Sequence, residues 1–169
     1  ASCEVCTAGQ SSTGPKAACT PCQKGEYQNE AEASSYEACK PCREGKFAKD
    51  AVTACAFCEK GLYQDEKAAS EYKCKGCENG RFQNRAGMSS CNPWQSCSPG
   101  FSKTGGTETT DAECHSCETG AYQTETIPEG GTVKACDTCN KGTASPNART
   151  ACEDCPKGLN YDNCQAFKV

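Results

Sequence analysis

The sequence predicts a small disulfide-rich fold: an elongated tandem array of disulfide-closed loops with short two-stranded β-ribbons, almost no helix and no conventional core. Two observations lead to this expectation. Leu, Ile, Val and Phe together number only twelve of the 169 residues, which is about 7% of the chain. A chain in which these residues make up less than roughly 20% is expected to stay disordered. The 19 cysteines exceed the density that is typical of a secreted disulfide scaffold. Bridges must therefore replace the missing apolar core.

A spacing pattern repeats along the whole chain. Eight Cys-x-x-Cys pairs occur, a ninth pair, Cys91 and Cys97, is stretched, and Cys164 stands alone. The second cysteine of every pair is followed by x-x-Gly, which gives Gly9, Gly25, Gly45, Gly61, Gly80, Gly100, Gly120, Gly142 and Gly158. Glycine adopts positive φ without strain, so each of these positions suits a tight turn that starts a hairpin. We assign this structural turn role to Gly25, Gly45, Gly61, Gly80 and Gly120.

An aromatic residue stands at the sixth position, counted from the second cysteine of a pair, in five repeats: Tyr27, Phe47, Tyr63, Phe82 and Tyr122. We expect these rings to cover the bridge and the glycine, as structural packing and not as a ligand-stacking platform. Glutamine follows at the seventh position in four repeats, and we expect it to be solvated or to bond an edge backbone group: Gln28, Gln64, Gln83 and Gln123.

Two bridge patterns are compatible with the paired cysteines. In the crossed pattern, two consecutive pairs link first to first and second to second. In the ladder pattern, the second cysteine of each pair joins the first cysteine of the next pair, and only Cys3 is left over. Spacing alone does not fix which pattern forms.

Two stretches carry resemblances to known families. The repeats of the form "CEKGLYQDE", together with "CNKGTASPNARTACEDCPKG" from Cys139, resemble ephrin-receptor-like cysteine-rich repeats. The segment from Cys77 to Cys114, with Trp94 between two cysteines, resembles a cysteine-rich domain of the tumour necrosis factor receptor superfamily. Both resemblances imply extracellular, non-catalytic, elongated modules, and the second makes Trp94 a candidate partner contact.

The resemblances divide the chain into three predicted parts. Residues 1–76 form tandem repeats, residues 77–117 form the receptor-like segment, and residues 118–169 form further ephrin-receptor-like repeats and a terminal loop. The receptor-like resemblance implies loop closure at Cys91 and at Cys114, which favours the ladder. We therefore predict the bridges Cys6–Cys19, Cys22–Cys39, Cys42–Cys55, Cys58–Cys74, Cys77–Cys91, Cys97–Cys114, Cys117–Cys136, Cys139–Cys152 and Cys155–Cys164.

The cysteine left over, Cys3, is expected to be unpaired or to form an intermolecular bridge. It stands where the closing cysteine of a preceding loop would fall. In the ladder each loop is closed by its own bridge and is expected to contact mainly its neighbours, as in a solenoid.

Zinc is the rival interpretation of paired cysteines. Cys3, Cys6, Cys19 and Cys22 have the spacing of a four-cysteine zinc site. Against it, the spacing does not separate into groups of four, and the stretched pair Cys91 and Cys97 breaks the pattern. We therefore predict no metal and no cofactor.

Catalysis has little material to use. The single histidine, His115, lies in a two-residue spacer between cysteines, and the carboxylates are scattered over loop tips. We predict that the protein is not an enzyme.

The remaining signals narrow the class of function. The net charge of -4 has no basic run, so a nucleic-acid partner is not expected. No stretch is apolar for long enough to insert in a membrane. The chain starts at Ala1 without a signal-peptide pattern, which we take as a mature form or an excised segment.

We predict a secreted or extracellular protein, or one of another oxidising lumen. Its function is that of a structural or scaffolding rod that binds protein partners, among them copies of itself or subunits of a larger assembly. A receptor-type ectodomain that binds a soluble protein ligand is the alternative.

Overall fold

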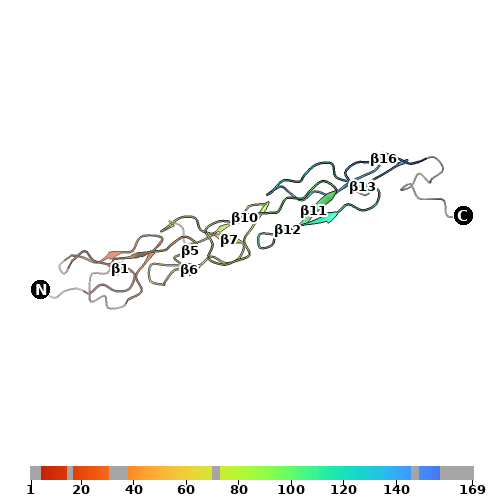
Figure 1. Ribbon diagram of the computed structural model, residues 1–169. Coiled ribbons are helices and arrows are strands. Elements are labelled where there is room, and N and C mark those ends of the chain that lie inside the picture. Colours follow the sequence, from red (N-terminus) through yellow and green to blue (C-terminus); the bar gives the residue numbers. More distant parts are fainter. Residues whose placement is uncertain (1–4, 15–16, 31–37, 70–72, 146–148, 157–169) are drawn as a thin grey trace. The chain divides into compact units, whose positions relative to one another are not determined.

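A computed structural model describes residues 5–14, 17–30, 38–69, 73–145 and 149–156. In these ranges the chain has no helix, and its sixteen short strands form eight two-stranded antiparallel sheets (Figure 1). Eight disulfides link successive cysteines. The predicted class, a small disulfide-rich tandem array with β-ribbons, is confirmed.

Each sheet is a ribbon of two strands. The pairs are β1 (Gln10–Ser11) with β2 (Thr20–Pro21), β3 (Glu26–Tyr27) with β4 (Lys40–Pro41), β5 (Lys46–Phe47) with β6 (Ala56–Phe57), β7 (Leu62–Tyr63) with β8 (Lys75–Gly76), β9 (Arg81–Phe82) with β10 (Asn92–Pro93), β11 (Phe101–Gly105) with β12 (Ala112–Ser116), β13 (Ala121–Tyr122) with β14 (Asp137–Thr138), and β15 (Thr143–Ala144) with β16 (Glu153–Asp154). The five-residue strands β11 and β12 are the longest pair and stand out as arrows in Figure 1.

The Cys-x-x-Gly spacing produces the turn that starts each ribbon. In the third repeat the Lys46 N–H donates to the carbonyl of Arg43 at 3.1 Å, which closes a four-residue turn with Gly45 at its third position. Glycine is favoured there because that position of a type II turn needs positive φ. All five glycines predicted as structural turns have φ between 76 and 87°.

The second strand of most ribbons is the two-residue spacer of the next cysteine pair. Tyr63 is paired with Lys75, and Leu62 with Gly76, both of which lie between Cys74 and Cys77. The spacer therefore does more than connect two loops, since it completes the ribbon of the loop before it.

The disulfides follow the ladder. We number the closed loops 1 to 8 in chain order: Cys6–Cys19, Cys22–Cys39, Cys42–Cys55, Cys58–Cys74, Cys77–Cys91, Cys97–Cys114, Cys117–Cys136 and Cys139–Cys152. The Cα atoms of each pair are 5.5 to 5.8 Å apart, as disulfide geometry requires. The predicted Cys155–Cys164 bridge and the leftover Cys3 fall outside the described residues, because Cys164 and Cys3 are not among them.

The bridges and the seventh position form the interior in place of an apolar core. The cysteine that opens each of loops 1 to 7, which is the second of its Cys-x-x-Cys pair in all but the stretched one, is only 0 to 8% exposed. The five sixth-position aromatics are half-buried. The glutamines beside them are more deeply buried, at 0 to 1% exposed, so the expectation of solvated glutamines is wrong.

Hydrogen bonds to the backbone of their own loops explain why Gln64 and Gln83 are buried. Gln83 donates from Nε2 to the Ser90 carbonyl at 2.8 Å and accepts the Arg85 N–H at Oε1 at 3.0 Å. Gln64 makes the same two kinds of bond, to Lys73 and Glu66. A buried amide is tolerated when both its donor and its acceptor are used. For Gln64 and Gln83 the alternative expectation, a bond to a backbone group, is the one that holds, whereas the buried Nε2 of Gln123 has no hydrogen-bond partner among the described residues.

In loop 3 a residue other than glutamine forms the hydrogen bonds to the backbone of the loop. Its seventh residue is Ala48, which is 1% exposed and has no polar group to offer. Here Asp50 accepts the backbone N–H groups of Val52 and Thr53 at one carboxylate oxygen. These bonds lower the pKa of Asp50, the Thr53 N–H making the largest contribution.

Backbone hydrogen bonds tie consecutive loops together. The Gly45 N–H of loop 3 donates to the Gln64 carbonyl of loop 4 at 2.8 Å, and the Cys58 N–H returns a bond to the Gly45 carbonyl at 2.9 Å. Loops 1 and 2 are joined in the same way through Gly9, Gln28 and Cys22. Neighbour-to-neighbour contact, as in a solenoid, is therefore present.

Contact also reaches the next loop but one, which the sequence did not indicate. A Cβ added to Gly25 of loop 2 would lie 2.3 Å from the carbonyl carbon of Ala68 in loop 4. A Cβ on Gly45 of loop 3 would lie 2.1 Å from the carbonyl oxygen of Gly87 in loop 5. The glycine turns are thus places of close backbone approach as well as of positive φ.

The chain divides into two compact units. The first comprises Ala1–Cys77 and Gln83–Asn92, and the second comprises Glu78–Phe82 and Pro93–Val169. Loops 1 to 4 lie in the first unit and loops 6 to 8 in the second. The three-part division at residues 77 and 117 stays a prediction.

Candidate interaction surface

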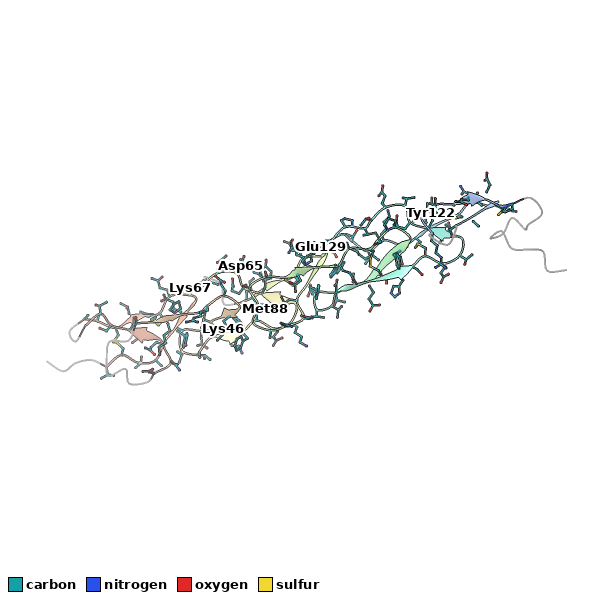
Figure 2. All side chains as sticks on the ribbon, in the orientation of Figure 1. Lys46, Asp65, Lys67, Met88, Tyr122 and Glu129 are labelled. Carbon is teal, nitrogen blue, oxygen red and sulfur yellow. A yellow bond between two sulfur atoms is a disulfide. The ribbon has the colours of Figure 1, made fainter. Side chains whose placement is uncertain are left out.

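A hollow opens in the first unit where the turns of loops 3 and 4 meet. Its volume is about 530 Å³, and its described lining is Arg43, Glu44 and Lys67. Arg43 and Glu44 are the two residues between Cys42 and Gly45 in the turn of loop 3, and Lys67 precedes Ala68 in loop 4. Figure 2 shows the side chain of Lys67 on its loop.

Backbone contacts hold both sides of this hollow. The Ala68 N–H of loop 4 donates to the carbonyl of Cys42 at 2.8 Å. Ala68 has a φ of 54°, one of two described non-glycine residues in the left-handed region. Such a backbone costs a residue with a Cβ about 1–2 kcal/mol. It is kept here because the contacts to Cys42 and to the turn at Gly25 fix the position of the chain.

The two cations that line the hollow form no ion pairs with the described part of the chain. Within the described residues, neither Arg43 nor Lys67 has an ion-pair partner. Lys75 shows the contrasting case, since its Nζ lies 2.7 Å from Asp65 and 2.9 Å from Glu66. The bond from Lys75 lowers the pKa of Asp65, and the bonds to Asp65 and then Glu66 raise the pKa of Lys75.

An exposed patch of mixed character lies on loops 3 and 5, and we call Lys46, Phe57 and Met88 the Phe57 patch. Phe57 is 60% exposed, and the Lys46 Nζ sits 4.2 Å from the centre of its ring. Lys46 and Phe57 are direct cross-strand partners in β5 and β6. The ring lies against Gly87, and Met88, the next residue, is 37% exposed. Figure 2 labels the side chains of Lys46 and Met88. Aromatic and methionine side chains are enriched at protein interfaces.

Trp94, the candidate partner contact, is instead a packing residue of the second unit. It is 5% exposed, and its indole N–H donates to the Thr107 carbonyl at 3.3 Å. The ring lies against Gly106, where an added Cβ would come within 2.7 Å of it. A buried side chain does not offer a partner surface, so this expectation is corrected.

The spacing explains the burial of Trp94. It stands three residues after Cys91, which is the place of the second cysteine in an ordinary pair. Its backbone N–H donates to the Gly80 carbonyl at 2.8 Å, as the Cys58 N–H does to Gly45. Tryptophan has therefore taken the structural position of a cysteine, and Cys97 is displaced by three residues.

Lys103 is a buried cation that sequence reasoning missed. It stands at the seventh position of loop 6, where four other loops have glutamine, and is 1% exposed. Its Nζ donates to the carbonyls of Pro128 at 2.8 Å and Gly131 at 3.3 Å, both in loop 7. Burial lowers the pKa of Lys103, and the negative charge of Asp111 opposes this shift. Its role is to fasten loop 7 to loop 6.

No metal site is found among the described residues. The sixteen cysteines of loops 1 to 8 are bonded to one another and have no thiolate to offer zinc. No group of three or more His, Cys, Asp or Glu side chains could hold a metal ion in that part of the chain. His115 is exposed on β12 and lies 3.3 Å from Glu113.

Comparisons with known proteins do not assign the chain to a family. No protein-family model matches it, and no significantly similar sequence is found among curated proteins. In the ranges that the structure covers, there is also no helix long and apolar enough to cross a membrane.

Proposed function

We propose that this chain is a non-enzymatic, disulfide-stapled interaction module that serves a structural or scaffolding role in an extracellular assembly. The observation that carries the proposal is that disulfide-closed loops are bonded to their neighbours. Within each unit, each loop is closed by its own bridge and neighbouring loops are joined by backbone hydrogen bonds, as Gly45 is to Gln64. Within a unit, exposed side chains are therefore presented at fixed relative positions. Preorganised surfaces bind with less loss of side-chain and loop freedom.

The compartment follows from the same bridges. Eight disulfides point to an oxidising environment. Secretion or surface exposure is the form of this environment that we propose. The resemblance of the repeats to extracellular cysteine-rich modules supports the same view.

The Phe57 patch is the surface through which we propose that the first unit binds a partner protein. Because the Phe57 ring is 60% exposed, a partner that covers it would bury a large apolar area, and this burial favours binding. The Lys46 ammonium over the ring adds a charge that a partner can approach from the side. The receptor-type alternative has lost its proposed contact, because Trp94 is buried.

The test begins with a binding experiment on the oxidised protein. The native chain and the variants Phe57→Ser and Val133→Ser are immobilised and exposed to secreted proteins of the source cells. Val133 is the control because it is an apolar residue of similar exposure, 54%, in loop 7. Bound proteins are identified by mass spectrometry, and the leading one is purified and titrated against all three chains.

The expected result is that one purified partner binds the native chain and Val133→Ser alike, and binds Phe57→Ser at least about tenfold more weakly. A tenfold loss corresponds to about 1.4 kcal/mol, within what burial of one aromatic side chain supplies. Sedimentation velocity over a range of concentrations tests a second copy as the partner. Equal affinity of Phe57→Ser, or the absence of any partner in both experiments, would refute the proposal.

A further inference from the structure

We propose that the hollow between loops 3 and 4 is a second binding site that takes a short carboxylate-bearing segment of a partner protein. This site is separate from the Phe57 patch, and its identification as a protein-binding site rests on the proposed interaction function. The carrying observation is that two cations from different loops, Arg43 and Lys67, line one hollow of about 530 Å³ and have no ion-pair partner within the described residues.

Arg43 and Lys67 form no ion pair with the described residues, although carboxylates are near them in the sequence. Asp65 and Glu66 precede Lys67 directly, yet both bind Lys75. Glu44 follows Arg43 and lines the same hollow without forming an ion pair to either cation. Arg43 and Lys67 therefore face solvent. Elsewhere in the chain an exposed lysine does form an ion pair, since Lys40 lies 3.2 Å from Glu30.

The turns on which the cations stand are held in place. The carbonyl of Cys42, next to Arg43, accepts the N–H of Ala68, next to Lys67, at 2.8 Å. The backbones that carry the two side chains are thus joined directly. The left-handed φ of Ala68 belongs to the same contact. Strain of this kind is found where the surroundings over-determine a local conformation.

The chemistry of the lining favours carboxylates over other anions. The planar guanidinium of Arg43 can bind both oxygens of a carboxylate, and the Lys67 ammonium adds a point charge. Glu44 and the net charge of -4 repel a long, dense polyanion such as a sulfated glycan or a nucleic acid. Two cations with one acid among them match one or two carboxylates on a short peptide segment.

The experiment titrates the ¹⁵N-labelled, oxidised chain with a capped glycine-rich peptide that carries two glutamates. The control peptide has glutamine in place of each glutamate. The variants are Arg43→Gln, Lys67→Gln and Glu44→Gln, with Lys60→Gln as the matched control. Lys60 occupies the turn of loop 4 that corresponds to Glu44 in loop 3, and its loss changes the net charge as much as the loss of Arg43 or Lys67.

We expect the acidic peptide, and not its glutamine counterpart, to shift the amide signals of Gly45 and Ala68. Arg43→Gln and Lys67→Gln should each weaken binding about two- to fivefold, the range of one solvent-accessible ion pair. Glu44→Gln should strengthen it, Lys60→Gln should leave it unchanged, and 1 M salt should abolish it.

Three outcomes would overturn the proposal: shifts located elsewhere, an equal loss of affinity in Lys60→Gln, or shifts at Gly45 and Ala68 with a heparin-derived oligosaccharide but none with the acidic peptide. The last outcome would make the ligand a sulfated glycan. Phe57→Ser should bind the acidic peptide normally, so failure at the hollow is distinguishable from failure of the Phe57 patch.

Discussion

Replacing Gly45 by alanine tests whether close approach between loops 3 and 5 holds the first unit together. Gly45 has a φ of 76°, and its carbonyl and N–H both bond to loop 4. An alanine Cβ would lie 2.1 Å from the Gly87 carbonyl oxygen and 2.6 Å from its carbonyl carbon. All atoms of Gly87 near the new Cβ are backbone, so no side-chain rotation relieves the overlap.

Two contributions set the expected loss of local stability. The left-handed backbone costs a residue with a Cβ about 1–2 kcal/mol. Forcing extra volume into a packed region costs about 1–3 kcal/mol. We therefore expect Gly45→Ala to lower the free energy of opening around loops 3 to 5 by about 2–5 kcal/mol.

Native-state hydrogen exchange is the suitable assay, because the bridges remain closed and only local opening is measured. The informative amides are those of Cys58, which donates to the Gly45 carbonyl, and Gly87, which donates to the Cys58 carbonyl. A loss of 2 kcal/mol corresponds to about thirtyfold faster exchange. Amides in loop 7 should be unaffected.

Gly105→Ala is the matched control for the backbone contribution alone. Gly105 also has positive φ, 65°, but nothing lies within 4 Å of an added Cβ. Its substitution should destabilise the β11 and β12 ribbon by only about 1–2 kcal/mol. If Gly45→Ala accelerated exchange no more than Gly105→Ala does, the close contact between loops 3 and 5 would have no energetic weight and the argument would fail.

Three further predictions concern single loops. Gln83→Ala leaves the Ser90 carbonyl and the Arg85 N–H without their partner, and should lower the stability of loop 5 by about 1–3 kcal/mol in hydrogen exchange; unchanged exchange would contradict it. The pKa of Asp50 is lowered from its ordinary 3.8, so its stabilisation of loop 3 is present above pH 3.8 and is lost as the pH falls through the lower folded value; the Thr53 amide shift should report this titration, and Asp50→Asn should remove it. Under limiting reductant, the bridge of loop 8, with both cysteines half-exposed, should open before that of loop 5, with both buried, as followed by alkylation and mass spectrometry; the reverse order would refute control by access.

The sequence was sufficient for the features that depend on short, repeated spacing. A glycine three residues after a bridged cysteine specifies a turn, because the conformation involves only adjacent residues. Gly61 and Gly120 therefore have the expected positive φ. The pairing of the cysteines is different, because spacing left both the crossed and the ladder pattern open; the receptor-like resemblance favoured the ladder, and the observed bridges follow it.

Residue type could not predict that the seventh position is buried, since glutamine is mostly exposed in proteins. The usable signal was its recurrence directly after the aromatic, which a solvated residue has no reason to show. Lys103 is harder still, because its two acceptors, Pro128 and Gly131, lie in the next loop. Trp94 could have been placed by counting three residues from Cys91.

The hollow was beyond sequence reasoning because it depends on how far one loop is displaced against the next. Arg43 and Lys67 are separated by 24 positions in the sequence and by the bridge of loop 3. Only the bond from Ala68 to Cys42 shows that their turns meet. Backbone contacts set the displacement of one loop against the next, and no periodicity of residue types in the sequence predicts it.

The stack constrains few side chains, and this leaves its surface chemistry open to change. Each loop has its bridge and its glycine turn, and loops 2 to 7 also have a buried seventh residue. The two residues that precede the glycine of the turn share no residue type. They are Arg43 and Glu44 in loop 3 but Glu59 and Lys60 in loop 4. Loop length also varies, since the bridged cysteines are 13 to 19 positions apart in the sequence. Because the side chains of Arg43 and Lys67 take no part in the bridges, turns or hydrogen bonds that hold the described loops, one loop junction can acquire a charged hollow without any change to those features.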